Sequence, residues 1–236
     1  MKIELLNKTD EEISVITDMD ITLANAIRRS VEEIPIFAID EVDVYKNDSA
    51  LYDEIIAHRL GLIPLKNQKL KGKVEIELKL KAKGKSGGTK IMSGSLGELV
   101  VYDNIPIVLL DENQEIEVVA KARTGEGIKH AKFSPGTIHY KYLPKIKISH
   151  DAERYSELAE LYPENFEFEE KLKVRDVTYG DLDQIDLKDY PGVSVEFGDD
   201  LIIYIETWGQ IEVKEIFSEA CEALKENLTD VLKAIK

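Results

Sequence analysis

The feature that most constrains this chain is a run of 23 residues, Val213–Ile235, with an apolar side chain at every third or fourth position. This spacing predicts an α-helix with one continuous apolar stripe. The stripe consists of Val213, Phe217, Ala220, Leu224, Leu228, Val231 and Ile235. Such a stripe has to be covered, either by the chain's own sheet or by a matching helix of a partner. The pattern alone leaves both interpretations open.

The composition describes an acidic globular protein. Of the 236 residues, 43% are hydrophobic and 33% charged, and the formal net charge is −15. A surface of this charge repels nucleic acid unless basic residues cluster, and we interpret the lysines of 66–85 as a solvated strand face. No apolar run approaches the roughly 20 residues that span a bilayer, and the first residues lack a signal-peptide pattern. We therefore expect a cytoplasmic protein.

The first 45 residues predict two strands, a helix and a further strand. Thr22 is expected to cap the helix, which buries Leu23, Ile27 and Val31 and stops at Pro35. The predicted strands are Lys2–Asn7, Ile13–Thr17 and Ile36–Tyr45.

The region from 50 to 148 reads as mostly β structure, because apolar and polar residues alternate in several segments. After residue 149 the pattern changes to a short helix and a buried strand. The predicted elements are the strand Val74–Lys81, the strand Thr137–Ile148 interrupted by Pro144, the helix Asp151–Tyr162 and the strand Leu201–Ile205.

Residues for catalysis or metal binding do not form recognisable sets. The four histidines lack a metal-ligand spacing, and the single cysteine, Cys221, excludes a Cys-ligated centre within the chain. The acidic pairs Asp18/Asp20 and Asp181/Asp183 lack supporting ligands. The loop Gly125–Lys132 could cradle a phosphate through backbone N–H groups, but no base or nucleophile accompanies it. We expect no catalytic, cofactor-binding or metal-binding residues in this chain.

Three motifs carry a family resemblance. The first is Thr-Leu-Ala-Asn-Ala-Ile-Arg-Arg at 22–29, with the strand that follows it to Asp40. The second is Asp-Glu-Ile-Ile-Ala-His-Arg-Leu-Gly-Leu-Ile-Pro-Leu at 53–65, and the third is Gly-x-Gly-x-x-His-Ala-Lys-Phe-Ser-Pro at 125–135. Together they resemble the family of D-type subunits of archaeal DNA-directed RNA polymerase, which is equivalent to eukaryotic subunit 3 and similar to the N-terminal domain of the bacterial alpha subunit.

The resemblance implies an assembly platform within a nucleotidyltransferase complex. Such a protein pairs with the small alpha-like subunit L through the terminal helices, and the pair docks the second-largest subunit and the small subunits N and P. It would meet nucleic acid only through the complex, and no membrane. The implied interface residues are Asn25, Arg28, Arg29, Asp53, Glu54, His58, Arg59, Gly61, His130, Lys132, Phe217, Ala220, Leu224, Leu228 and Val231.

The resemblance also implies an α+β fold with a discontinuous dimerisation domain, 1–45 plus 197–236. A β-rich domain, 46–148, is inserted into it, and a third, ferredoxin-like domain would occupy 149–196. Many relatives ligate an iron–sulfur cluster in that third domain through cysteines. The region has none here, so we expect a degenerate domain without a cluster.

The sequence also fits other interpretations. Arg28 and Arg29 could form a solvated helix face paired with Glu32 and Glu33, instead of an interface. The whole chain could be a self-assembling DNA sliding clamp, a class that is also acidic and β-rich. A clamp implies a two-fold internal repeat, which this sequence lacks, and the long terminal helix fits it badly.

Overall fold

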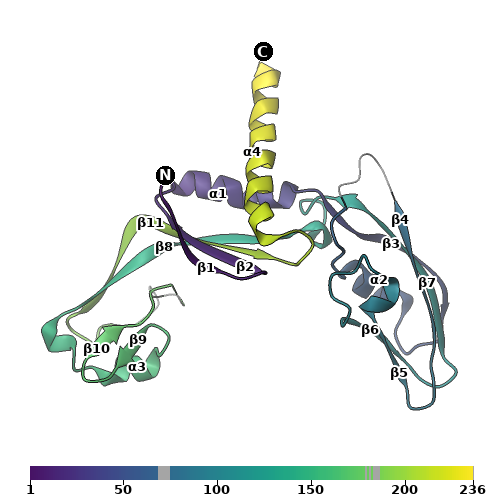
Figure 1. Ribbon diagram of the computed structural model, residues 1–236, viewed down its shortest axis with the longest axis horizontal. Helices are drawn as coiled ribbons and strands as arrows, with labels where there is room; N and C mark the ends of the chain where they lie inside the picture. Colours follow the sequence, from purple (N-terminus) through teal and green to yellow (C-terminus); the bar gives the residue numbers. More distant parts are fainter. Residues whose placement is uncertain (69–74, 179, 181, 183–186, 236) are drawn as a thin grey trace. The chain divides into compact units, whose positions relative to one another are not determined.

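The computed structural model describes residues 1–68, 75–178, 180, 182 and 187–235. Its elements form a mixed α+β fold (Figure 1) with several separate sheets. The chain divides into two compact units. The first unit comprises Met1–Lys8, Ser14–Ala24 and His139–Tyr204, and the second comprises Thr9–Ile13, Asn25–Ile138 and Ile205–Lys236.

The elements of the N-terminal half follow one another in this order: β1 (Ile3–Lys8), β2 (Glu12–Thr17), α1 (Ile21–Ser30), η1 (Val31–Glu33), β3 (Ile36–Asn47), α2 (Asp53–Gly61), β4 (Ile76–Lys83), β5 (Thr89–Met92), η2 (Ser93–Leu96) and β6 (Pro106–Leu110). The rest of the chain adds β7 (Glu115–Gly125), η3 (Ala131–Phe133), β8 (Gly136–Ile148), η4 (His150–Ala152), α3 (Ser156–Leu161), β9 (Phe166–Phe168), β10 (Leu172–Val174), β11 (Val193–Thr207) and α4 (Val213–Ile235).

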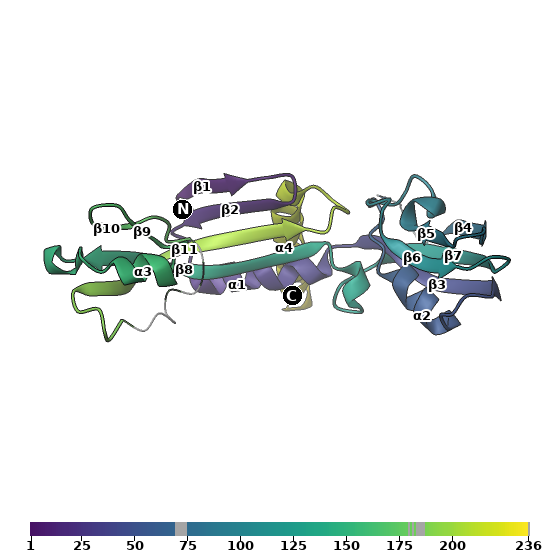
Figure 2. The same ribbon diagram turned by 90° about the horizontal axis from the view of Figure 1, so that it is seen from below.

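Four strands form one sheet in the order β1-β2-β11-β8 (Figure 2). The predicted strand Leu201–Ile205 lies within β11 and is almost wholly buried. The prediction that Pro144 interrupts this strand was wrong, because β8 runs without interruption from Gly136 to Ile148. β8 is an edge strand of this sheet, and an edge strand tolerates proline because an N–H on its outer side needs no partner.

Helix α1 starts at Ile21, two residues earlier than the predicted start at Leu23. Asp20, and not Thr22, caps it: the Asp20 carboxylate accepts a hydrogen bond from the backbone N–H of Thr22 at 2.8 Å. Hydrogen bonds from Thr22 lower the pKa of Asp20. The buried face consists of Ala24 and Ile27 and continues past the helix end, whereas Leu23 is exposed. Leu23 lies about 100° around the helix from Ala24 and so falls outside this face.

The core of the second unit lies between a three-stranded sheet, β3-β7-β4, and the elements α2, β5 and β6. The predicted strand Ile36–Tyr45 is confirmed as β3. The strand predicted at Val74–Lys81 is confirmed from Ile76 onward as β4, and Val74 itself lies outside the described residues. The largest wholly buried side chains of this core are Phe37, Ile39, Ile56, Leu60, Ile63, Leu65, Leu80, Ile107, Leu110 and Ile116.

The first unit has a smaller core of its own beside the hairpin β9-β10. The helix predicted at Asp151–Tyr162 is present only in part, as the single turn η4 followed by α3. The buried residues of this smaller core are Ala152, Leu158, Phe166, Leu172 and Val193. The candidate pair Asp181/Asp183 lies outside the described residues.

Candidate protein–protein interface

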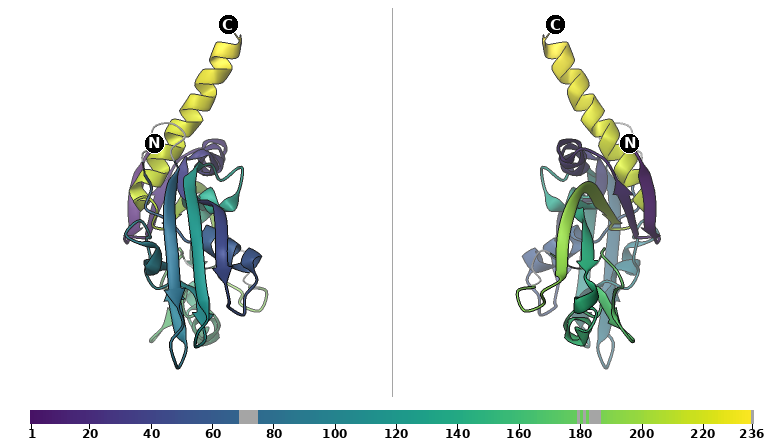
Figure 3. Two further views of the ribbon diagram at one scale, coloured as in Figure 1. Left: turned by 90° about the vertical axis from the view of Figure 1, so that its right-hand side faces the viewer. Right: turned by 90° about the vertical axis from the view of Figure 1, so that its left-hand side faces the viewer.

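Helix α4 divides into a packed half and an exposed half. Val213, Ile216 and Ala220 are buried within the second unit. Farther along, Leu228 is 58% exposed and Val231 54% exposed. Figure 3 shows no other element of this unit beside the C-terminal half of the helix. The chain's own core therefore covers the first half of the stripe and leaves the second half open.

The predicted interface residues of α4 divide in the same way. Ala220 is fully buried in its own unit, so it does not lie on an exposed surface. Phe217 and Leu224 are partly exposed, and Leu228 and Val231 are exposed. Leu232 and Ile235 are also exposed and were not among the predicted interface residues, although Ile235 belongs to the predicted stripe.

The C-terminal end of α1 presents both predicted arginines to solvent. The Arg28 guanidinium donates two hydrogen bonds to Oδ1 of Asn25, at 3.1 and 3.0 Å. The alternative interpretation, in which the arginines pair with Glu32 and Glu33, is not observed. Glu32 instead accepts a hydrogen bond from Ser134, and Glu33 accepts one from Asn227. Among the described residues, neither arginine has a carboxylate partner.

These arginines and the middle of α4 belong to one surface. A hollow of about 420 Å³ is lined by residues from α1, η1, the loop after β7, the start of β8 and α4. Its lining includes Arg28, Arg29, Ile128, Leu224 and Asn227. Two motifs that are far apart in sequence thus lie side by side, next to the exposed half of α4.

The predicted residues of α2 have different roles. Asp53 accepts a hydrogen bond from the Asn47 side chain at 2.8 Å, and Arg59 donates one to the carbonyl of Pro106. A Cβ at Gly61 would lie 3.7 Å from the Ile39 carbonyl, an ordinary contact distance, so this position does not require glycine for space. Asp53 and Arg59 thus form hydrogen bonds within their own unit.

Glu54 and His58 lie on the exposed side of α2. Three exposed apolar side chains lie near them, Tyr52, Ile55 and Leu62, none of which was among the predicted interface residues. Tyr52 and Ile55 are three positions apart, and Ile55 and Leu62 are seven positions apart. This is the spacing of residues on one face of a helix, so the sequence itself could have indicated this second apolar face.

The loop at 125–135 is built by close packing. A Cβ on Gly125 would lie 2.7 Å from the Phe133 ring, and one on Gly127 would lie 1.9 Å from a carboxylate oxygen of Glu32. The backbone N–H of Ile128 donates to the Glu32 carbonyl at 3.1 Å. The glycines therefore let the loop approach η1 and Phe133, which accounts for them without a phosphate ligand.

Two predicted residues of this loop, His130 and Lys132, differ in exposure. His130 is exposed, and its Nδ1 accepts a hydrogen bond from the backbone N–H of Lys132 at 3.1 Å. The Lys132 side chain is only 13% exposed and pairs with Asp40, which also pairs with Arg123. Burial raises the pKa of Asp40, but the hydrogen bond and charge of Lys132, with the charge of Arg123, outweigh it and hold the pKa below its usual value.

We expect Lys132→Met to lower the free energy of unfolding at pH 7 by about 2 to 3 kcal/mol. Breaking a buried ion pair typically costs about 3–5 kcal/mol. The cost is lower here because the pair is only partly buried and Arg123 still faces Asp40 in the variant. Because folding lowers the pKa of Asp40, the pair stabilises the protein above the unfolded-state pKa of about 3.9 and loses this effect as the pH falls through the folded-state pKa. Urea unfolding at pH 7 measures the loss of stability, and the same measurement at pH 3 shows how the loss depends on pH.

Lys129→Met is the matched control, since Lys129 lies in the same loop and pairs with Glu126 on the surface. It should change the free energy of unfolding by less than about 0.5 kcal/mol. An equal loss in both variants, or a loss at Lys132 that persists unchanged at pH 3, would contradict the role given to this pair.

None of the helices in the described part of the chain is both long and apolar enough to cross a membrane. Within the same residues, no group of three histidine, cysteine or acidic side chains could hold a metal ion.

Comparison with known proteins identifies relatives over nearly the whole chain. The family model described as the RNA polymerase Rpb3/Rpb11 dimerisation domain matches residues 15–228. The DNA-directed RNA polymerase subunit Rpo3 of Pyrococcus horikoshii is 35% identical, over 95% of this chain and 93% of the relative. Rpo3 of Methanothermobacter thermautotrophicus is 32% identical over 98% of both chains. Rpo3 of Thermococcus kodakarensis is 39% identical, over 68% of this chain and 67% of the relative.

Proposed function

Because this chain belongs to the archaeal RNA polymerase Rpo3 family, whose members are the D-type subunits, we propose that it is a non-catalytic assembly subunit of DNA-directed RNA polymerase. Its task is to pair with a small alpha-like subunit of the L type, and the pair forms the platform on which the large subunits assemble. No comparison supports the sliding-clamp interpretation, and the family match replaces it.

The exposed half of α4 is the observation that carries this proposal. Leu228, Val231, Leu232 and Ile235 leave four large apolar side chains in solvent on one helix. Contiguous apolar surface of this kind marks an interaction site in a soluble protein. In a family defined by a dimerisation domain, the matching surface is the corresponding helix of the alpha-like partner.

We assign the docking of the other subunits to two further surfaces. The first contains Asn25, Arg28 and Arg29 and faces the second-largest subunit. The second is the exposed side of α2, with Glu54 and His58, and it serves the large or small subunits, including N and P.

The three-part organisation also belongs to this proposal: a dimerisation domain from 1–45 and 197–236, an inserted domain at 46–148, and a degenerate ferredoxin-like domain at 149–196. With Cys221 as the only cysteine, the last domain would hold no iron–sulfur cluster. The assembly would work in the cytoplasm.

Co-expression of the chain with subunit L tests the central claim. Light scattering on the purified product should give the mass of a one-to-one heterodimer. The same measurement on the chain alone provides the control, because an exposed apolar half-helix without its partner should self-associate in a concentration-dependent manner. A homotrimer whose mass does not change when L is present would overturn the proposal and restore the clamp.

A further inference from the structure

A tight turn after β11 carries the only tryptophan of the chain into a cavity of the second unit. Gly209 has φ = +83°, and a Cβ there would lie 2.7 Å from Val101. Thr207 stabilises the turn, since its hydroxyl donates to the Ile211 carbonyl at 2.8 Å and accepts from the Gly209 N–H at 3.0 Å. The turn therefore holds Trp208 and Gln210 on either side of Gly209 in defined positions.

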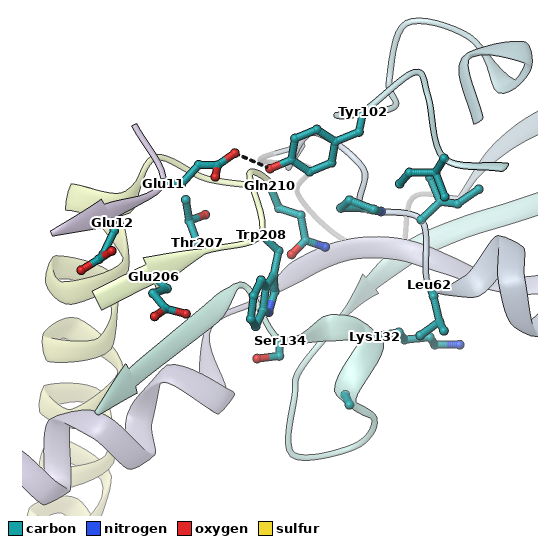
Figure 4. Close-up of a pocket in the computed structure, with 14 residues that line it drawn as sticks. Glu11, Glu12, Leu62, Tyr102, Lys132, Ser134, Glu206, Thr207, Trp208 and Gln210 are labelled. Atoms are coloured by element: carbon teal, nitrogen blue, oxygen red, sulfur yellow. Dashed lines mark hydrogen bonds between the residues drawn. The ribbon is translucent and has the colours of Figure 1, made fainter. Parts of the chain in front are cut away.

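The cavity has a volume of about 590 Å³. It is lined by the start of β2, the loop after α2, the segment before β6, η3 with the residues beside it, the end of β11 and the turn. Figure 4 shows Trp208 and Gln210 in its middle, with Glu11, Glu12 and Glu206 on one side and Leu62 and Lys132 on the other. Trp208 is 46% exposed. A volume of this size is typical of a ligand pocket and leaves room for a side chain together with part of the segment that carries it.

The charges around the cavity are unbalanced. Among the described residues, Glu11, Glu12 and Glu206 have no ion-pair partner, and Glu11 only accepts a hydrogen bond from the Tyr102 hydroxyl at 3.2 Å. Burial, and then the charge of Glu11, raise the pKa of Tyr102, so it stays a neutral donor. Lys132 adds no free cation, because its ammonium group is paired with Asp40. The cavity thus carries three uncompensated negative charges.

Gln210 provides an independent sign of a missing ligand. Its side chain is only 7% exposed, yet its Oε1 has no hydrogen-bond donor within the described part of the chain. A buried acceptor without a partner is costly and rare in folded proteins. An occupant of the cavity with an N–H group would satisfy it.

We propose that this cavity receives an arginine side chain from a basic segment of another polymerase subunit. The guanidinium group has five N–H donors, stacks on the face of an indole and forms forked hydrogen bonds with carboxylates. It therefore matches Trp208, the Gln210 acceptor and the glutamates at once. The inference rests on the proposed function, because it takes the source of the arginine to be a neighbour in the complex.

Trp208 reports on the cavity directly, because the chain contains no other tryptophan. We would titrate the full-length chain with acetyl-Gly-Arg-Gly-amide and follow tryptophan fluorescence. The matched probes replace arginine with citrulline, which keeps the shape without the charge, and with leucine. The arginine peptide should bind at least tenfold more tightly than either. Equal binding of the leucine peptide, or no response to arginine, would overturn the proposal.

Variants separate the cavity from the general acidity of the surface. Glu12→Gln with Glu206→Gln should weaken binding of the arginine peptide about tenfold. Glu98→Gln with Glu112→Gln removes the same charge at exposed sites outside the cavity lining and should have no effect. Gln210→Met should weaken binding severalfold and melt at or above the temperature of the parent, because it removes an unpaired buried acceptor. Equal loss in both glutamate pairs would show nonspecific attraction and overturn the proposal.

Cross-linking in the reconstituted polymerase identifies which neighbour supplies the arginine. With p-benzoylphenylalanine in place of Trp208, irradiation should link the chain to a segment that contains arginine. If the polymerase assembles but the linked segment lacks arginine, this inference fails while the proposed function stands. If the parent chain assembles with no polymerase subunit, the proposed function fails, and the peptide titration still decides whether the cavity binds arginine.

Discussion

Replacing Leu228 with Asp is expected to abolish pairing with the alpha-like partner while the chain itself stays folded. Leu228 is 58% exposed in the isolated chain, so the change should alter the free energy of unfolding by no more than about 0.5 kcal/mol. In the proposed heterodimer the partner helix would cover this position, and a carboxylate buried there without a cation would cost several kcal/mol. A loss of about 4 kcal/mol weakens binding roughly a thousandfold.

Leu228 is a better position for this test than Leu224. Leu224 is only partly exposed and lines the hollow beside α1, so an aspartate there would also disturb the chain's own packing. Thr229→Asp is the matched control, because it adds the same charge one residue later and about 100° around the helix. Sizing chromatography with subunit L should show a heterodimer for this control and separate chains for Leu228→Asp. If Leu228→Asp pairs with subunit L as well as the parent does, the proposal that the exposed half of α4 contacts the partner is refuted.

The second large effect concerns Arg28 and Arg29. Replacing both with Ala should leave the heterodimer with L intact and block recruitment of the second-largest subunit. Both side chains are exposed and have no carboxylate partner among the described residues, so their loss should cost the isolated chain no more than about 1 kcal/mol. At an interface, loss of a paired arginine strands the buried carboxylate of the partner, which costs about 2–5 kcal/mol.

Stepwise reconstitution measures this effect. The variant heterodimer should elute normally on a sizing column but give neither the larger complex nor transcription. Arg154→Ala with Arg175→Ala removes the same charge from exposed positions elsewhere and should assemble like the parent. If the Arg28 and Arg29 variant supports full assembly, these arginines are only a solvated helix end.

Local sequence patterns predicted most of the elements. Strand alternation predicted β3 and most of β4, and a continuous apolar run predicted the buried part of β11. The 3.6-residue period gave both ends of α4 as Val213 and Ile235. These patterns succeed because each depends on side chains within one element. The prediction at Pro144 failed because the energetic cost of a proline in a strand depends on whether that strand lies at the edge of its sheet. The position of a strand in the sheet is a property of the whole sheet and cannot be read from the strand's own residues.

The candidate site was less predictable. The interface residues expected from the motifs at 22–29 and 53–65 stay predictions. Asp53 and Arg59 form hydrogen bonds within their own unit, and the exposed Tyr52, Ile55 and Leu62 were not among the predicted residues. These motifs contain both residues that form hydrogen bonds within their own unit and residues that are exposed to solvent. Only exposure and hydrogen bonding separate the two groups.

The sequence by itself determined that α4 exists, how long it is and that one of its faces is apolar. Helical periodicity depends only on the spacing of residues within one continuous segment. It also indicated the family, because each of the three motifs is a continuous segment of the chain. Only the tertiary structure decided that the first half of the stripe is covered and the second half is free, since burial depends on which distant segments pack there. The same holds for the cavity, where Glu11, Tyr102, Lys132 and Gln210 meet although up to 199 positions separate them along the chain.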